Sequence, residues 1–289
     1  MKIGTCIFSL PKLLGRERAY ELIKGAGFDA IDHTAPMTEY QPFSGLFALP
    51  EKDFAREFVS DAEALNKAGL TCSQVHVPFP TYPERKQGIN QAEEFAFMKS
   101  AIKKSFRAAR EVGAPYCVLH PVMRCGWNRD DNPELTFRMN VELYAELLNE
   151  AKKQGVKIAL ENMPNAWIPT ATPESLIALI DAMGDEDFVA CLDTGHALIT
   201  KTPLADFVRA LGSRLKVLHV HDNDGIKDQH AMPFTGVADW QAFATALREV
   251  GFQGTLSLEA LFDEKALLKS PLECLKQAKE RAQKIVDMI

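Results

Sequence analysis

Eight short apolar runs rich in β-branched residues recur along the 289-residue chain, and longer amphipathic segments separate them. The runs cover residues 2–9, 28–34, 71–79, 116–122, 156–163, 188–196, 215–223 and 254–260. Segments 16–27, 94–113 and 239–251 have helical periodicity and end at a glycine, as helix C-termini often do. Eight strand–helix repeats predict an α/β fold, a single-domain (β/α)8 TIM barrel over residues 1–289. A doubly wound open sheet would need a glycine-rich crevice loop, which we do not find.

Composition narrows the class of partners. The formal net charge of −6 gives no support to an electrostatic nucleic-acid footprint, so no nucleic-acid partner is expected. No run of eighteen apolar residues occurs, and Pro11 and nearby charges interrupt the N-terminal run too early for a signal peptide. The six cysteines lack a paired CxxC spacing, which is typical of reduced, buried thiols. We therefore expect a cytoplasmic protein with no membrane association.

The ends of the strand runs carry metal-binding residue types. In a (β/α)8 barrel the active site lies at the carboxyl ends of the strands and in the loops that follow. Six of the eight runs end in such residues, namely His76, His120, Glu161, Asp193 with His196, His219 with His221, and Glu259. Asp228 and His230 follow in the loop after the seventh run.

Three of these carboxylates follow apolar stretches, "KIAL" before Glu161, "VACL" before Asp193 and "GTLSL" before Glu259. A buried, unpaired charge is costly, and no comparable group of Lys or Arg accompanies these residues, so the pattern favours a metal ion. Carboxylate oxygens with imidazole and no cysteine suit one divalent ion. We favour Mn²⁺, with Zn²⁺, Mg²⁺ and Co²⁺ also compatible.

The ordered motifs "VHVPFP", "HP", "LEN", "LDTGH", "HVHDNDG…DQH" and "LE" resemble the xylose isomerase-like TIM-barrel superfamily over essentially the whole chain. That superfamily includes sugar isomerases, ketose 3-epimerases and the endonuclease IV type of DNA-repair enzyme. The resemblance implies that Glu161, Asp193, a histidine after the seventh strand and Glu259 bind the metal. Both His219 and His221 fit the pattern of His, two residues, then an acid, and residues two apart share a face. The run "HVHDN" favours His219, which leaves His221 as a supporting residue or a substrate contact.

In the isomerase branch, the resemblance implies proton transfer next to a carbonyl through an enediolate-like intermediate of a carbohydrate substrate. Glu161 and Glu259 would be the catalytic acid/base pair as well as metal ligands. The expected substrate contacts are His76, His120, His196, His221, Asp228, His230 and Trp127. A homo-oligomer is compatible with this function.

Two other functions fit parts of the pattern. The repair-nuclease branch uses a trinuclear zinc site, and the chain has the matching residue type at all nine ligand positions, His76, His120, Glu161, Asp193, His196, His219, Asp228, His230 and Glu259. Against that branch, the loops after the second and fourth strands carry Phe43, Phe47 and Trp127 but few cations, more typical of walls that stack on a sugar ring. A non-catalytic sugar-binding subunit is the third alternative.

The ketose 3-epimerase pattern is incomplete. By the resemblance, those enzymes carry a glutamate and an arginine that grip the substrate, and here Trp167 and Gly225 stand in their places. An inosose-type cyclic ketone, another polyol, a sugar acid or a glycoside therefore remain candidate substrates. Asp32 and His33 are expected at the rim of the second strand, and Trp240 is expected to pack in the first turn of a helix.

Overall fold

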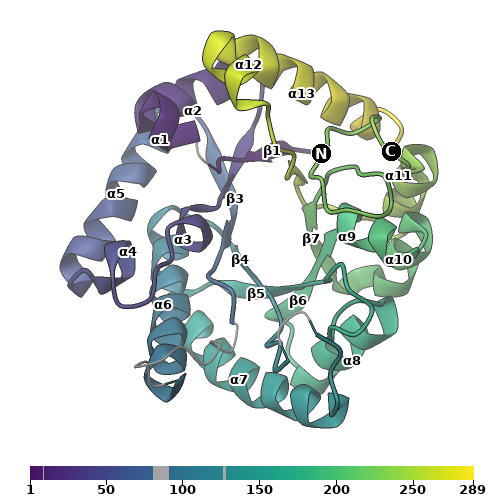
Figure 1. The fold of residues 1–289 in the computed structure, drawn as a ribbon. Helices are drawn as coiled ribbons and strands as arrows, with labels where there is room; N and C mark the ends of the chain where they lie inside the picture. Colours follow the sequence, from purple (N-terminus) through teal and green to yellow (C-terminus); the bar gives the residue numbers. More distant parts are fainter. Residues whose placement is uncertain (9, 81–90, 126–127) are drawn as a thin grey trace.

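Eight parallel strands form the centre of the molecule and helices surround them (Figure 1). The computed structural model describes residues 1–289 except 9, 81–90 and 126–127. The strands are β1 (Ile3–Cys6), β2 (Ala30–His33), β3 (Thr71–His76), β4 (Tyr116–Leu119), β5 (Lys157–Glu161), β6 (Phe188–Asp193), β7 (Leu215–His219) and β8 (Leu256–Leu258). The predicted strand–helix alternation is confirmed.

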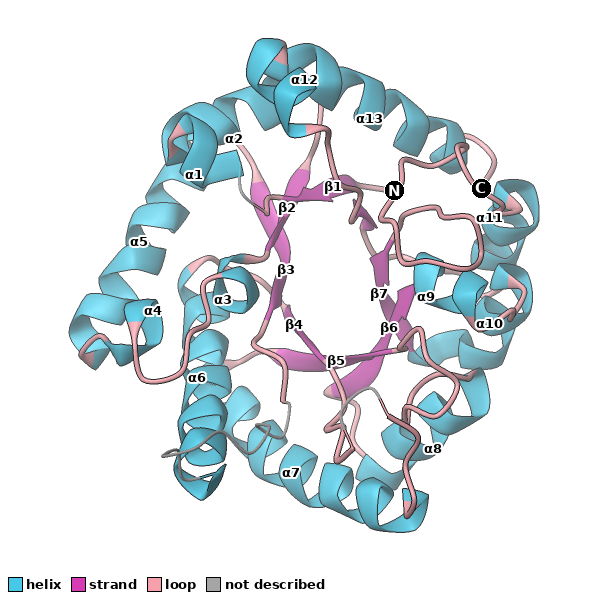
Figure 2. Cartoon of the chain, in the orientation of Figure 1, coloured by secondary structure: helices cyan, strands magenta, loops and turns pink. Residues whose placement is uncertain are grey.

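The sheet curves into a barrel (Figure 2). Its strand order is β7-β6-β5-β4-β3-β2-β1-β8, with parallel pairing throughout. The two ends meet at Val220, whose amide donates to the Ser257 carbonyl at 2.8 Å and whose carbonyl accepts from the Glu259 amide at 3.0 Å. The predicted (β/α)8 TIM barrel is therefore confirmed, and the carboxyl ends of all eight strands surround one mouth.

The helices cover the outside of the barrel. They are α1 (Leu10–Leu14), α2 (Arg16–Gly25), α3 (Ala35–Thr38), α4 (Gly45–Ala48), α5 (Glu51–Ala68), α6 (Gln91–Glu111), α7 (Pro133–Gln154), α8 (Pro173–Met183), α9 (Thr194–Ile199), α10 (Leu204–Leu211), α11 (Trp240–Glu249), α12 (Glu264–Lys269) and α13 (Pro271–Val286). α5 and α7 end at Gly69 and Gly155, both with φ of 70°, where a side chain would be strained. None of the helices in the described residues is long and apolar enough to cross a membrane.

Hydrophobic side chains fill two regions. Between sheet and helices, aromatic residues such as Phe58, Phe106 and Phe243 are almost completely buried. Inside the barrel, a smaller cluster of Val118, Ala159, Val189, Cys191 and Val217 packs together. This packing beneath the mouth supports the polar side chains at the strand ends.

All eight strands end before the predicted runs do, and in two of them the following contacts show why. The run 188–196 is a strand only to Asp193, because the Asp193 Oδ1 accepts the His196 backbone N–H at 2.7 Å and so caps α9. The run 215–223 is a regular strand only to His219, and the following chain returns to pair Asp222 with Ala231. Both changes place polar residues at the mouth.

Candidate metal centre at the barrel mouth

Four side chains from adjacent strands converge at the mouth. Glu161, Asp193 and His219 are the last residues of β5, β6 and β7, and Glu259 directly follows β8. One ligand atom from each lies within 4.8 Å of the others. All four are buried, with Glu259 the most exposed at 4%. The structure thus brings together the four residues that the resemblance implies as metal ligands.

The counter-charges of this cluster are imidazoles. Among the described residues, the ion pairs of Glu161, Asp193 and Glu259 are all made with histidines. Glu161 lies 2.8 Å from His120 Nε2 through Oε2 and 2.9 Å from His219 Nδ1 through Oε1. Three buried carboxylates without Lys or Arg partners are a donor set that fits a divalent cation.

The two glutamates differ in their electrostatics. Burial by itself would raise the pKa of the Glu161 carboxyl, but His219 and His120 hold this pKa well below its ordinary value. Burial raises the pKa of Glu259 well above its ordinary value, and the charges of Glu161 and Asp193 raise it further. Glu161 is therefore ionised in the metal-free chain, whereas the fold disfavours charge on Glu259.

Asp193 and His219 are both charged in the metal-free chain. The pKa of Asp193 is lowered to about 2, because His196 and His221 outweigh the effect of burial. Burial opposes charge on His219 as well, yet the surrounding acids, including Glu259, Glu161 and Asp32, raise its pKa well above the ordinary value.

His76 and His120 lie on one side of the centre. His76 Nε2 is 3.4 Å from Glu161 Oε2, and His76, His120 and Glu161 form a further group that could hold an ion. Burial lowers the pKa of His120 to about 4, so its ring is neutral. Phe79 packs against the His120 ring, with ring centroids 3.9 Å apart.

His196, Asp228 and His230 lie on the other side. Asp228 Oδ2 is 3.2 Å from His196 Nε2 and 3.3 Å from His230 Nε2. Despite burial, Asp193 and Asp228 raise the pKa of His196 to about 10. His230 stacks on the His221 ring at 4.1 Å between centroids. The structure thus places His76, His120, His196, Asp228 and His230, which are expected from the sequence as substrate contacts, beside the four central residues.

His221 lies beside the four central residues rather than among them. Its Nε2 is 3.0 Å from Asp193 Oδ2, and its backbone N–H donates to the Thr194 hydroxyl at 3.0 Å. The ring covers Gly195 so closely that a Cβ there would lie 1.9 Å from His221 Cε1. Gly195 in "LDTGH" therefore leaves room for His221.

Asp222 holds the loop after β7. Its carboxylate accepts the backbone N–H groups of Gly236 and Ala238 and the Trp240 indole N–H at 3.3 Å. Trp240 begins α11 and is 4% exposed, so its predicted packing role is confirmed. This anchor fixes the segment that carries Asp228 and His230.

Two residues were missed or misplaced by sequence reasoning. Asp32 is fully buried and lies 2.9 Å from His219 Nε2 through its Oδ2, so it contacts a candidate ligand rather than the rim. The rim expectation for His33 is wrong, because its side chain leaves β2 on the opposite face and contacts Asp61 of α5 at 3.1 Å. Neighbouring residues of a strand face opposite sides, so Asp32 and His33 could have been told apart if the inward face of β2 had been known.

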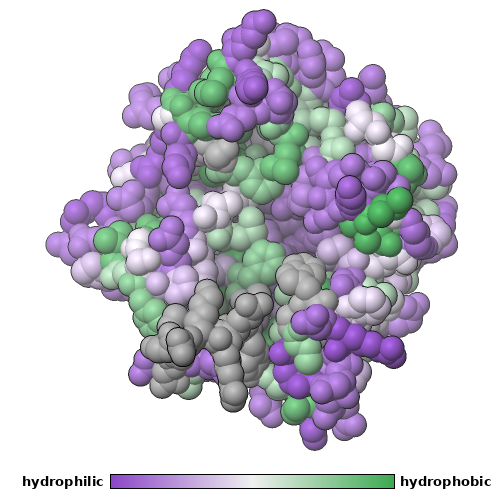
Figure 3. Space-filling view, viewed as in Figure 1, coloured by the Kyte–Doolittle hydropathy of each residue, from purple (hydrophilic) through white to green (hydrophobic). Residues whose placement is uncertain are grey.

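The aromatic residues of the loops after the strands differ in exposure. Figure 3 shows this face of the molecule hollowed at its centre. Phe43 is 51% exposed, whereas Phe47 is buried against Tyr40 and Phe54, so Phe47 is not a wall of the site. Trp167 is also 51% exposed. Trp127 lies outside the described residues.

Fold and site together define a (β/α)8 barrel with a candidate metal centre at the carboxyl ends of its strands. The model of the family described as xylose isomerase-like TIM barrel matches residues 20–280. The chain belongs to this family.

Sugar-converting enzymes occur among the similar proteins. An uncharacterised protein of Sinorhizobium fredii is 26% identical over 271 residues, which is 89% of this chain and 84% of that protein. Inosose isomerase of Bacillus velezensis is 25% identical over 193 residues, which is 65% of this chain and 68% of that protein. A zinc-containing structure of the IOLI protein is 19% identical, with a TM-score of 0.73, over 100% of this chain and 98% of that one. The IOLI structure and this chain therefore share the same fold.

Proposed function

We propose that the protein is a metal-dependent sugar isomerase or epimerase that moves a proton next to a substrate carbonyl. The observation that carries the proposal is the convergence of Glu161, Asp193, His219 and Glu259 within 4.8 Å. In the described part of the chain, the ion-pair partners of the three buried carboxylates are all imidazoles. The similarity to inosose isomerase supports the reaction class.

The metal would be held by these four side chains. When bound, a divalent ion polarises a carbonyl and stabilises the negative charge that develops as a neighbouring C–H loses its proton. We favour Mn²⁺, and the zinc atom in the IOLI structure keeps Zn²⁺ as the nearest alternative. Carboxylate and imidazole ligands suit either ion.

Glu161 and Glu259 are the proposed acid/base pair. Their pKa values are displaced in opposite directions, so the two carboxyls differ in proton affinity before any ligand binds. Pairs of carboxyls with diverging pKa values are a recurrent arrangement for proton transfer. Glu161 would take the proton from carbon on one side of the substrate, and Glu259 would return one from its own side.

Histidines around the centre would bind the substrate. His196 is held through Nδ1 by the Asn162 carbonyl at 2.7 Å, and its Nε2 contacts Asp228, so its ring is fixed at the mouth. Asp228 and His230 are the least buried members of the site and are suited to contact substrate hydroxyls. His76, His120 and His221 complete the proposed set of polar contacts, and Trp127 remains a proposed contact from the sequence.

The reaction class is tested by solvent proton exchange. The metal-loaded protein is incubated in D2O with inososes and a panel of ketoses, and deuterium at carbon is followed by NMR. Exchange next to the carbonyl of at least one compound, lost in Glu161→Gln, is expected. Binding of these compounds without exchange would instead indicate the sugar-binding subunit and contradict the enzyme proposal.

A multinuclear phosphodiesterase is the second candidate. His76, His120 and Glu161 form a separate ligand group, and Asp228 contacts both His196 and His230, as a site with several ions would need. Hydrolysis of an abasic-site duplex by the zinc-loaded protein, without exchange into any carbonyl sugar, would favour this candidate. We expect no such hydrolysis.

A further inference from the structure

We propose that Asp32 and Gln74 are positioning residues that set which nitrogen of His219 faces the metal. The inference rests on the proposed metal centre and not on the identity of the substrate. It concerns two buried residues on β2 and β3, beneath the mouth of the barrel.

The two nitrogens of His219 have different surroundings. Nε2 lies 2.9 Å from Asp32 Oδ2, while Nδ1 lies 2.9 Å from Glu161 Oε1 and 3.3 Å from Glu259 Oε2. Asp32 Oδ2 already accepts the Gln74 amide N–H, so the geometry makes this oxygen the acceptor for a proton on His219 Nε2. The lone pair of a metal-binding His219 is then on Nδ1, directed at Glu161 and Glu259.

Gln74 fixes Asp32 in turn. The Gln74 amide donates to Asp32 Oδ2 at 2.9 Å and to the Leu218 carbonyl at 3.3 Å, which ties Asp32 to the strand that carries His219. The Asp32 Oδ2 atom thus accepts from both Gln74 and His219. A carboxylate held from two sides loses little rotational freedom when an ion binds, which favours binding.

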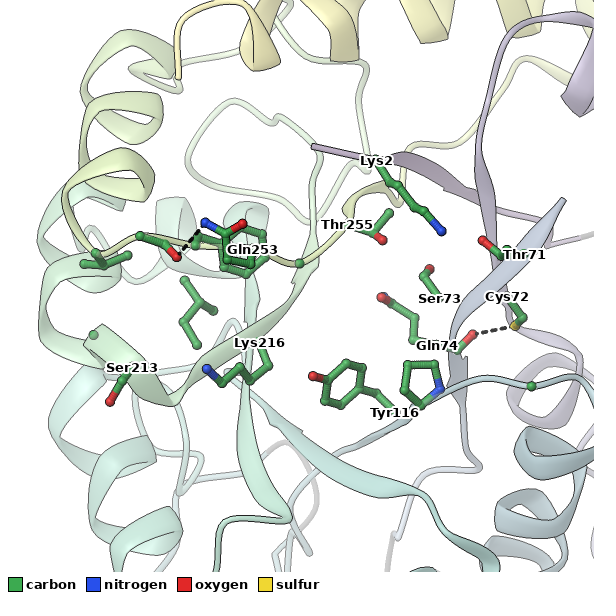
Figure 4. A pocket seen from close by; sticks show the side chains of 18 residues that line it. Lys2, Thr71, Cys72, Ser73, Gln74, Tyr116, Ser213, Lys216, Gln253 and Thr255 are labelled. Atoms are coloured by element: carbon green, nitrogen blue, oxygen red, sulfur yellow. Dashed lines mark hydrogen bonds between the residues drawn. The ribbon is translucent and has the colours of Figure 1, made fainter.

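Gln74 also separates this network from a cavity below. A cavity of about 690 Å³ opens at the amino-terminal end of the barrel, and its lining includes Gln74, Tyr116, Lys216 and Thr255 (Figure 4). Gln74 is 2% exposed and Asp32 is fully buried. With water kept from Asp32, its hydrogen bond to His219 is stronger than it would be in solvent.

The chain offers a matched control on the other face of β2. His33 Nε2 lies 3.1 Å from Asp61 Oδ2, so this pair is a second buried imidazole–carboxylate contact, and Asp61 has Arg16 and Tyr20 as its further partners. It packs against α5 and not against the metal centre. Asp61→Asn should therefore affect folding without changing metal affinity.

The test measures the affinity of the full-length protein for Zn²⁺ and Mn²⁺ by competition with a chelator. Asp32→Ala should weaken binding about 10–100-fold, the usual effect of losing a partner of a ligating histidine. Asp32→Asn should weaken metal binding less, because its amide oxygen still accepts the Nε2 proton. The metal affinity of Gln74→Met should lie between that of Asp32→Asn and that of the wild type. A folded Asp32→Ala protein with wild-type affinity, or an equal loss in Asp61→Asn, would overturn the inference.

A second measurement needs no variant. Nitrogen NMR of the imidazoles in the zinc-loaded wild-type protein should show His219 ligated through Nδ1 and protonated at Nε2. Ligation through Nε2 would contradict the proposal even if every variant failed to fold. If the wild-type protein binds no divalent ion, the proposed metal centre itself is contradicted. That outcome differs from a bound ion with the opposite orientation of the His219 ring, which contradicts only this inference.

Discussion

Glu161→Gln should destabilise the metal-free protein and Glu259→Gln should not, although both remove one carboxyl group from the same cluster. Each change keeps the side-chain volume and removes the capacity for charge. Glu161 is ionised and contacts His120 at 2.8 Å and His219 at 2.9 Å, and its pKa lies well below the ordinary value. Folding therefore favours its charge.

Removing one partner of a buried ion pair costs about 3–5 kcal/mol. For a chain of this size about 1 kcal/mol moves the melting temperature by about 2–4 °C, so Glu161→Gln should lower it by about 6–20 °C. Glu259 has a raised pKa, so the fold disfavours its charge at neutral pH, which is a cost relative to the unfolded chain. Glu259→Gln removes this cost and should leave the melting temperature unchanged or higher.

The assay is thermal unfolding at pH 7 with a chelator present, followed by titration with Mn²⁺ and Zn²⁺. Both variants should bind metal more weakly than wild type, since each lacks a ligand. Equal destabilisation by the two substitutions, or a more stable Glu161→Gln, would refute the opposite displacement of the two pKa values.

Three further results are expected. Metal affinity should rise with pH, because Glu259 and His219 both have raised pKa values in the metal-free chain and must lose protons when the ion binds. Calorimetry in buffers of different ionisation enthalpy would count the released protons. A metal affinity independent of pH would contradict this prediction. Gly195→Ala should lower the free energy of unfolding, measured in urea, by about 1–3 kcal/mol, because the new Cβ would collide with the His221 ring. An unchanged midpoint of the urea transition would show that the ring moves freely. Asp222→Ala should increase amide hydrogen exchange in residues 223–239 by removing four hydrogen bonds to the Asp222 carboxylate. Unchanged protection there would mean that the loop has other anchors.

The strand pattern predicted the barrel because each buried parallel strand reads as an apolar run, and each glycine after a helical segment predicted a helix end. The strand-end carboxylates were predictable for the same reason, since "KIAL" and "VACL" place Glu161 and Asp193 where a buried strand ends. These inferences depend on local sequence alone. They needed no knowledge of how strands pair.

Asp32 and His33 could not be assigned from the sequence. The pairing of β2 with β3 shifts register between Ile31 and Asp32, and this irregularity is a property of the assembled sheet. The contact of Asp32 with His219 joins residues far apart in the chain, and so does the contact of His33 with Asp61. Which residue faced the barrel interior therefore depended on tertiary structure.

Metal analysis of the purified protein, with anomalous diffraction at the mouth of the barrel, tests the central claim most directly. The expected result is one divalent ion bound by Glu161, Asp193, His219 and Glu259. Three zinc ions that also engage His76, His120 and His230 would contradict the single-metal account, and a metal-free mouth in protein loaded with Mn²⁺ and Zn²⁺ would contradict the metal centre altogether.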